Sequence, residues 1–228
     1  MSSLWDKIYL NFIKEDRYMY LVNGLKNTLI ITLFAVIIGV LLGFLVAVIR
    51  STYSKTGKLR ILDKLCGIYL TVIRGTPVMV QLLIMFYVVF VSSNNKVMVA
   101  IIAFGINSGA YVAEIVRSGI MSIDQGQFEA GRSLGFGYTQ TMIYIILPQA
   151  FKNILPALAN EFIVLLKETS ICGYIGLTDL TRGGDIIRSR TYDAFLPLIG
   201  VALIYLIMVA GLSALVRMLE RRLRTSDR

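Results

Sequence analysis

Long apolar runs separated by short polar segments extend along most of this chain. Residues 29–49 and 194–216 contain no charged side chain, and residues 97–116 contain one, Glu114. An apolar segment of about 20 residues can cross the ~30 Å hydrocarbon core of a bilayer as an α-helix. The pattern therefore predicts membrane-spanning helices over these three runs.

Two further apolar runs are interrupted but are still long enough to span. Residues 65–91 contain the break Arg74-Gly75-Thr76-Pro77, and residues 151–166 contain Lys152, Pro156 and Glu161. We therefore predict an all-α, polytopic membrane protein with about five transmembrane helices in a single domain, residues 1–228. The expected spans are approximately 24–50, 62–91, 97–120, 149–168 and 194–218. The mixed polar and aromatic N-terminal segment predicts an interfacial helix packed against the bundle.

Residues 122–147, between the third and fourth expected spans, predict two short helices joined by a glycine turn. Ser122–Gln125 has the S-x-x-Q pattern of a capping box, so the first helix is expected to start there or near Gln127. Gly135 suits the left-handed position that follows a helix. A second helical run follows from about Tyr138 to Leu147, and Pro148 is expected to mark its boundary with the next span.

Composition agrees with this pattern: 56% of residues are hydrophobic, mean hydropathy is +0.71, and only 16% are charged. The net charge of +9 suggests nucleic-acid binding, but topology explains it better. Basic residues follow the first span and the fifth, and five spans place both clusters on one side, which the positive-inside rule makes cytoplasmic. We expect a multi-pass protein of a prokaryotic plasma (inner) membrane, contacting lipid and no nucleic acid, with its N-terminus outside and its C-terminus cytoplasmic. The two clusters are Arg50, Lys55, Lys58, Arg60 and Lys64, and Arg217, Arg221, Arg222, Arg224 and Arg228.

Several kinds of chemistry are disfavoured by residues that the sequence lacks. Histidine is absent, and Cys66 and Cys172 are expected near opposite membrane faces, too far apart to pair. No CxxC, HExxH or carboxylate cluster is present, so no metal site is expected. The phosphate loop GxxxxGK[ST] is also missing, so any ATP must be bound by another chain. We expect no bound cofactor and no enzymatic activity in this chain.

Polar residues at the bilayer midplane are candidates for a substrate site because burying them there is costly. At ~1.5 Å per residue, Asn107 and Gln81 lie ~15 Å deep and Glu161 lies ~18 Å deep. Their side chains could bind a zwitterion, with Glu161 accepting hydrogen bonds from an ammonium or guanidinium group. We place Ser108 and Tyr111 with them. The alternatives are that the two amides only hold helices together, that Glu161 pairs with Lys167, and that Tyr111 only packs.

The break at residues 74–77 and the nearby Glu114 predict a gate or a structural element. Pro77 suits the first turn of a helix and Thr76 could cap it, which would leave backbone N–H groups free to hold a carboxylate. The break lies nearer the cytoplasmic side, so Arg74, Thr76 and Pro77 are alternatively a gate or hinge. Glu114, close to Arg117, is expected to form a structural or gating ion pair. Gly39-x-x-x-Gly43 predicts close helix packing, either within the chain or across a dimer.

The segment 129–148 resembles the EAA motif of ABC importer permeases. That motif is E-A-A-x3-G-x9-I-x-L-P, and this chain departs from it only at Gly131, where alanine is usual. Other stretches resemble the polar amino acid importer branch, over about residues 24–217. They are RGTPVMVQ (74–81), SGAYVAEIVRSGI (108–120), GQFEAGRSLG (126–135) and NEFIVLLKETSI (160–171).

The resemblance implies the ABC type I importer permease fold and a coupling role for Glu129, Ala130, Gly131, Arg132 and Gly135. In such permeases these helices sit in a cleft of a separate ATPase subunit, which binds the ATP and magnesium. A second permease chain, identical or not, and an extracytoplasmic amino-acid-binding protein complete the assembly. The implied substrate is a polar amino acid, and Glu161 favours a basic one such as arginine, lysine or histidine. The alternatives are an ion-coupled secondary amino acid carrier working without an ATPase, and a structural membrane anchor.

Overall fold

The computed structural model describes residues 3–225, apart from the side chains of residues 55, 56, 224 and 225; Arg228 of the second basic cluster lies outside this range. All regular structure in the described residues is helical, so the all-α prediction is confirmed. In chain order the helices are α1 (Leu4–Ile8), η1 (Tyr9–Ile13), η2 (Lys14–Asp16), α2 (Tyr18–Thr56), α3 (Arg60–Gly75), α4 (Val78–Ile84), η3 (Met85–Val89), α5 (Lys96–Met121), α6 (Gln125–Ser133), α7 (Tyr138–Thr141), η4 (Met142–Ile146), α8 (Leu147–Glu168), η5 (Thr169–Ile175), α9 (Leu180–Thr191) and α10 (Phe195–Thr225).

The structure contains four helical segments long and apolar enough to cross a membrane, and a bent pair that makes the fifth. The four are built on α2, α5, α8 and α10, and the pair is α3 followed by α4 and η3, bent by 109°. The bend falls at the Arg74–Pro77 break because Pro77 lacks the N–H that would continue the helix. The count of about five spans is therefore supported, and the interrupted second span is a sharply bent one.

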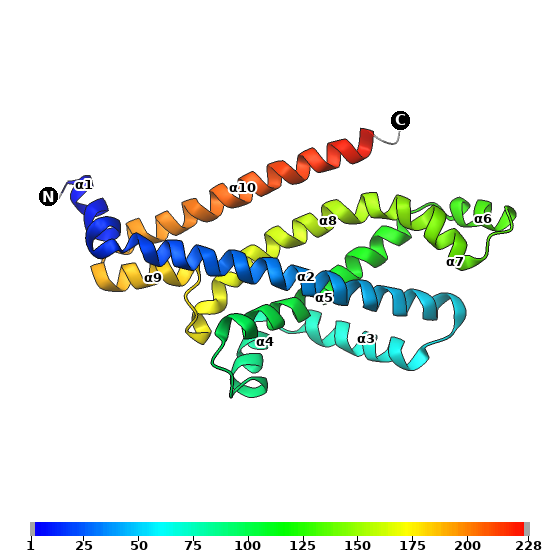
Figure 1. Ribbon diagram of the computed structural model, residues 1–228, viewed down its shortest axis with the longest axis horizontal. Helices are drawn as coiled ribbons and strands as arrows, with labels where there is room; N and C mark the ends of the chain where they lie inside the picture. Colours follow the sequence, from blue (N-terminus) through cyan, green and yellow to red (C-terminus); the bar gives the residue numbers. More distant parts are fainter. Residues whose placement is uncertain (1–2, 226–228) are drawn as a thin grey trace.

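α5 is the central helix of the bundle, and α2 packs along it (Figure 1). Glycines of α2 permit this approach: a Cβ at Gly39 would lie 2.8 Å from the Ser108 side chain, and one at Gly43 would lie 2.6 Å from Val112. The Gly39-x-x-x-Gly43 pattern is thus used within the chain. Close packing against α2 leaves Phe104, Ala110 and Val112 of α5 completely buried.

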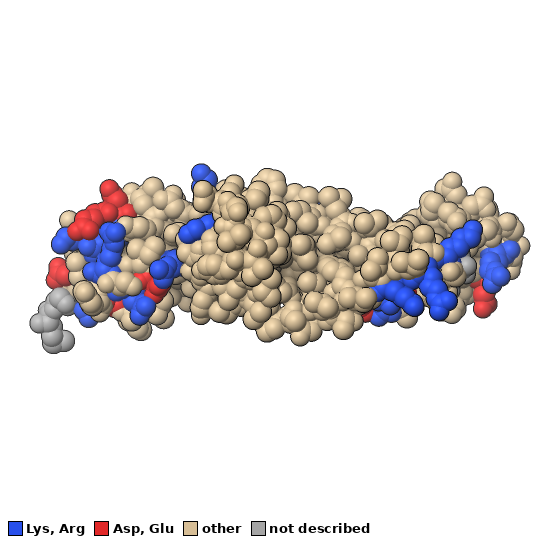
Figure 2. Space-filling model, turned by 90° about the horizontal axis from the view of Figure 1, so that it is seen from below, with Lys and Arg blue, Asp and Glu red and all other residues tan. Residues whose placement is uncertain are grey.

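The molecule is elongated, with different short helices at its two ends. α1 and α9 lie at one end with the N-terminus, while α6, α7 and the turn between α2 and α3 lie at the other, toward which α10 runs (Figure 1). Figure 2 shows Lys, Arg, Asp and Glu gathered toward the two ends of one face, with a broad uncharged stretch between them. This distribution is the one expected for a protein whose middle lies in hydrocarbon.

Two predictions about helix caps are wrong. The cap of α6 is Asp124, which accepts from the Gly126 N–H at 2.6 Å, whereas the Ser122 hydroxyl donates to the Gly119 carbonyl. Thr76 does not cap α4, because its hydroxyl donates to the Val72 carbonyl of the preceding helix. The boundary expected at Pro148 is present, since α8 begins at Leu147 with Pro148 in its first turn. The helix nevertheless continues without a break from Tyr138 to Ile175, because the wider π turn of η4 just before Pro148 accommodates a residue without an N–H.

The N-terminal segment and the segment between α8 and α10 also contain more short helices than the sequence pattern predicted. Instead of one interfacial helix over residues 1–24, the described part has the short pieces α1, η1 and η2, and α2 already begins at Tyr18. The chain turns at Glu15 and Asp16, whose φ angles are positive. Helix α9 was not predicted, because its sequence LTRGGDIIRSRT mixes glycine and charge with few apolar residues.

Candidate functional site

A groove of about 410 Å³ runs between α5 and α8 and reaches the end of α3. Helical spacing places its lining on one face of each helix: Tyr111 and Ser118 on α5 with Ser122 at its C-cap, and Asn153, Ala157 and Glu161 on α8. Arg74, at the end of α3, completes one wall. With Glu114 of α5 also in its lining, the groove combines two carboxylates, a guanidinium, hydroxyls and an amide in one open cavity.

Glu161 is a half-buried carboxylate on the α8 wall of the groove. The fully buried Ser108 of α5 donates a hydrogen bond to its Oε1 at 2.9 Å. The structure thus places Glu161 against Ser108 and not against Lys167, whose side chain is exposed. Ser108 engages one oxygen, and a carboxylate has acceptor capacity for several donors, so Glu161 retains capacity for a bound cation.

Gln81 and Asn107 bind each other rather than lining this groove. The Asn107 Nδ2 donates to Gln81 Oε1 at 2.9 Å, and Gln81 Nε2 donates to the Ile73 carbonyl and the Thr76 hydroxyl, both at 2.8 Å. Asn107 is 2% exposed. Together the two amides brace the bend between α3 and α4 against α5, which favours the structural interpretation over direct substrate contact.

Arg74, Tyr111, Glu114 and Arg117 form a cluster at the rim of the groove. Arg117 Nε lies 3.1 Å from both oxygens of Glu114, and a second guanidinium nitrogen also contacts that carboxylate. Arg74 is a more distant partner of Glu114, at 3.8 Å, and its Cζ lies 6.0 Å from the centre of the Tyr111 ring. The expected ion pair of Glu114 is present, with Arg117 as its principal partner.

The segment α6–α7 forms the expected hairpin of two short helices around a glycine turn. The Phe136 N–H bonds the Gly131 carbonyl at 3.0 Å and the Gly135 N–H bonds the Arg132 carbonyl at 2.9 Å, the two bonds of a Schellman motif. Gly135 has φ +82°, as predicted for this turn. Glu129, Ala130 and Arg132 are exposed, while Gly131 is buried. The hairpin thus leaves Glu129, Ala130 and Arg132 on its surface and packs Gly131 inward.

The hairpin contacts the spans on either side and the groove itself. The Tyr138 and Ser51 hydroxyls lie 3.2 Å apart, which connects α7 to α2. Asn153 on the groove wall donates to the Ser122 hydroxyl at 2.8 Å, immediately before α6. This second contact joins the end of α5 to α8 close to the start of the hairpin.

Three polar groove residues, Ser118, Ser122 and Asn153, were not among the sequence-based candidates for this site. The signal for Asn153 was its helical spacing from Ala157 and Glu161, which places a second polar side chain on the face of the carboxylate. In the described residues, no group of three or more His, Cys, Asp or Glu side chains is arranged to hold a metal ion. Cys66 and Cys172 are both free and buried, in separate core clusters.

Comparison with protein families gives one match over most of the chain. Residues 39–225 match the model of the "binding-protein-dependent transport system inner membrane component" family. The chain is 37% identical to the putative glutamine transport system permease protein GlnP of Rickettsia prowazekii, over 91% of this chain and 94% of that protein. It is also 37% identical to the arginine transport system permease protein ArtQ of Bacillus subtilis, again over 91% and 94%.

Comparison with solved structures gives the same fold. A chain of the crystal structure of an amino acid ABC transporter with histidines is 45% identical and superposes with a TM-score of 0.83. The match covers 92% of this chain and 98% of that one.

Proposed function

Since the chain belongs to the family of binding-protein-dependent transport system inner membrane components, we propose that it moves polar amino acids through the groove between α5 and α8. Family, relatives and fold make it the transmembrane permease subunit of an ABC amino acid importer, with the type I permease fold. Membership of this family excludes a purely structural membrane anchor, and it favours an ATP-driven importer over an ion-coupled carrier.

The assignment of the substrate site rests on the position of Glu161. It is a carboxylate at the depth of a bilayer midplane, on the wall of a cavity large enough for an amino acid, and its neighbour Ser108 orients it. In that position it accepts hydrogen bonds from the substrate ammonium group. Tyr111 lines the same cavity, and Asn107 and Gln81 act indirectly by holding the bend beside it.

The substrate class is a polar amino acid with a preference for basic ones. Named relatives transport glutamine and arginine, so the family itself accommodates both kinds of side chain. A carboxylate in a low-dielectric site binds a guanidinium or a second ammonium group more strongly than a neutral amide. Glu161 has acceptor capacity for more than one donor, so it would favour arginine, lysine or histidine where the side-chain cation reaches it in addition to the α-ammonium group.

Coupling to ATP hydrolysis is assigned to the exposed side of α6. Glu129, Ala130 and Arg132 face outward at the tip of the molecule, where a separate ATPase subunit with its ATP and magnesium would dock. Gly135 gives the turn that makes the hairpin compact. The Arg74–Glu114–Arg117 cluster at the rim of the groove acts as the gate toward that side, and Pro77 as its hinge.

The remaining partners follow from the two ends of the molecule and from its sides. The α6–α7 end is cytoplasmic, together with the C-terminus, and the α1–α9 end with the N-terminus lies outside and meets a binding protein. α10 exposes a broad apolar surface that lipid or a second permease chain would cover; it includes Leu203, Leu206 and Ile207.

The substrate site is tested by measuring amino acid binding to the purified permease–ATPase complex by isothermal titration calorimetry. Glu161→Gln is expected to weaken arginine binding about 10- to 100-fold, which is the loss of one charge-assisted hydrogen bond. Glu168→Gln is the matched control, since it makes the same charge change on the same helix away from the groove wall. Unchanged affinity in Glu161→Gln, or an equal loss in Glu168→Gln, would contradict the assignment.

A further inference from the structure

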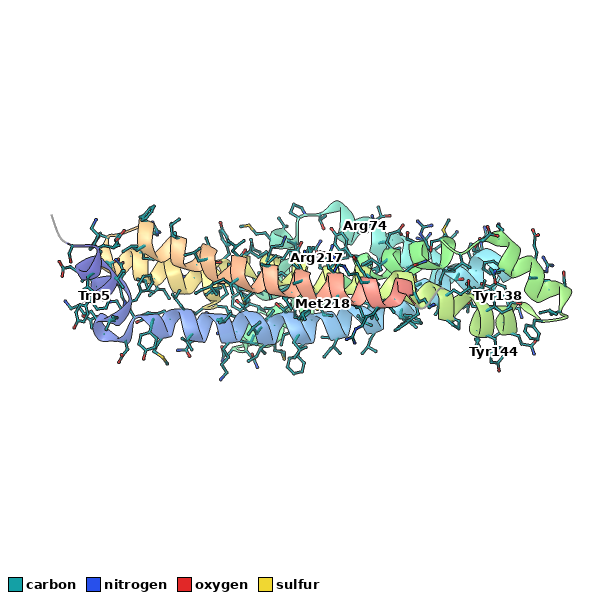
Figure 3. All side chains as sticks on the ribbon, turned by 90° about the horizontal axis from the view of Figure 1, so that it is seen from above. Trp5, Arg74, Tyr138, Tyr144, Arg217 and Met218 are labelled. Atoms are coloured by element: carbon teal, nitrogen blue, oxygen red, sulfur yellow. The ribbon has the colours of Figure 1, made fainter. Side chains whose placement is uncertain are left out.

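Glu161 shares the groove with a residue of opposite charge. Arg74 lines the same 410 Å³ cavity, although it comes from α3 and Glu161 from α8. In Figure 3, Arg74 lies nearer the middle of the long axis than Tyr138, which marks the hairpin end. Arg74 is therefore set back from the hairpin end, on the wall of the cavity that is proposed to bind the substrate.

The charge of Arg74 is only partly balanced by protein groups. Its carboxylate neighbour, Glu114, is engaged by Arg117 at 3.1 Å through both oxygens, whereas Arg74 stands 3.8 Å away. The cluster thus has two guanidinium groups for one carboxylate. The Arg74 side chain is 44% exposed and lies over the Tyr111 ring, which leaves its nitrogen atoms accessible from the groove.

A second arginine near this cluster has a carboxylate partner of its own. Arg50 of α2 donates from Nε to Asp63 of α3 at 3.3 Å, and it does not line the groove. Of the arginines near Glu114, Arg74 is therefore the one that lines the groove and lacks a close carboxylate partner in the described chain.

Opposite charges in one cavity are complementary to an α-amino acid. The ammonium and carboxylate of such a ligand are carried on one carbon atom, so a site that offers an anion and a cation together can bind both with charge-assisted hydrogen bonds. A guanidinium binds carboxylates through two parallel hydrogen bonds, with more directionality than an ammonium group. The hydroxyl of Tyr111 and the groove hydroxyls supply neutral polar contacts beside them.

We propose that Arg74 binds the α-carboxylate of the transported amino acid while Glu161 binds its ammonium group, so that the groove itself selects α-amino acids. This assignment rests on the proposed function of the groove and adds a specificity-determining residue to it. It also gives Arg74 a role other than gate or hinge, because its contact with the ligand is direct. Discrimination against ligands without a carboxylate then occurs in the permease, independently of any binding protein.

The test compares each amino acid with its amide, which keeps the α-ammonium and side chain but lacks the negative charge. Binding of arginine, argininamide, glutamine and glutaminamide is measured on the purified permease–ATPase complex without binding protein. For each amino acid that it binds, the wild-type complex is expected to bind the acid about 10-fold or more tightly than the amide. That difference is the effect of one charge-assisted contact. Arg74→Gln is expected to abolish that preference by weakening binding of the acid and leaving that of the amide unchanged.

Two further variants control for charge and for folding. Arg60→Gln removes a positive charge from the other end of the same helix and is expected to keep the wild-type preference. Arg74→Lys retains a cation and is expected to keep part of the preference for the acid over the amide. The ratio of acid to amide affinity is the informative quantity, since general damage to the fold weakens both ligands together.

The outcomes separate this proposal from the one on which it rests. Loss of binding of both acid and amide in Glu161→Gln, with an unchanged acid preference in Arg74→Gln, would overturn the role of Arg74 and leave the substrate groove in place. Full binding in Glu161→Gln would overturn the groove as the substrate site. A wild-type complex that binds acid and amide equally would also refute selection by Arg74.

Discussion

Asp179 is a completely buried carboxylate in the turn before α9, outside the membrane-spanning helices. Its Oδ2 accepts from the Thr181 N–H at 2.8 Å and caps α9, while Oδ1 has no hydrogen-bond partner. Gly24 brings α2 against it, since a Cβ there would lie 2.4 Å from the Asp179 carbonyl oxygen. Burial is the main cause that raises the pKa of Asp179 to about 6.

A raised carboxylate pKa in the folded state means that ionised Asp179 destabilises the fold. Relative to an unfolded pKa of about 3.9, its effect is absent below about pH 4 and grows as pH rises toward 6, where it approaches ~3 kcal/mol. Asp179→Asn keeps the cap and removes the charge, so the melting temperature of the complex should rise by several degrees at pH 7.5 and by about half as much at pH 5. Scanning fluorimetry at the two pH values measures this.

The control for Asp179→Asn is Asp185→Asn on the same helix. Asp185 is ion-paired with Arg182 and Arg188, at 2.6 and 2.5 Å, so its neutralisation should bring no stability gain at neutral pH. A gain in Asp179→Asn that is equally large at pH 5 would show that the buried charge is not its cause.

Gly131, in helix α6, shows why this chain departs from the motif it otherwise matches. A Cβ at this position would lie 2.7 Å from both Cγ2 and Oγ1 of Thr141, and 3.2 Å from Ile145. Thr141 is 1% exposed, so its side chain has little space to move. The helix accepts the ~1 kcal/mol lower propensity of glycine over alanine because α6 packs directly on α7.

The close approach of Gly131 to Thr141 predicts that a substitution at one of these residues compensates for a substitution at the other. Gly131→Ala alone should destabilise the hairpin by about 1–3 kcal/mol through overpacking, despite the better helix propensity of alanine. The double variant Gly131→Ala with Thr141→Ala should recover most of this loss, because the clashing atoms are gone. Thermal stability and ATPase co-purification of the two single variants and the double variant form a double-mutant cycle. Additive effects would show that the two side chains do not compete for this space.

At the level of helices, the sequence predicted what depends on long apolar runs and missed what depends on packing. The four helical segments long and apolar enough to span coincide with predicted spans, and the bent pair coincides with the second, which Pro77 interrupts. Helix α9 was missed because it is stabilised by burial of Leu180 and Ile187 and by the Asp179 cap, not by an apolar pattern of its own. The continuity of α7 with α8 was missed because a π turn absorbs Pro148.

The residues of the candidate site were also predicted only in part. Depth along single helices identified Glu161, Asn107 and Gln81, since depth requires only the ends of the spans. It could not show that the two amides bind each other, nor that Arg74 of α3 shares a cavity with Glu161 of α8. Those contacts depend on how the bent second span lies against α5, which a single sequence does not specify.

For the molecule as a whole, one continuous helical segment joins the coupling end to the substrate groove. Helix runs from Tyr138 to Ile175, 38 residues, and carries both the start of the hairpin's second helix and Glu161. Asn153, between them, contacts Ser122 just before α6. A partner that moves α6 and α7 would therefore move the groove wall with them, which is how hydrolysis at one end could change access at the other.

Substrate-stimulated ATP hydrolysis tests this account most directly, because it requires both the groove and the hairpin. The chain would be reconstituted with its co-purifying ATPase and assayed with a panel of amino acids as wild type, Glu161→Ala and Glu129→Ala. We predict that hydrolysis rises with basic amino acids, that Glu161→Ala abolishes this response, and that Glu129→Ala weakens all turnover. Failure of any ATPase to co-purify, or amino acid uptake that persists without ATP, would contradict the account.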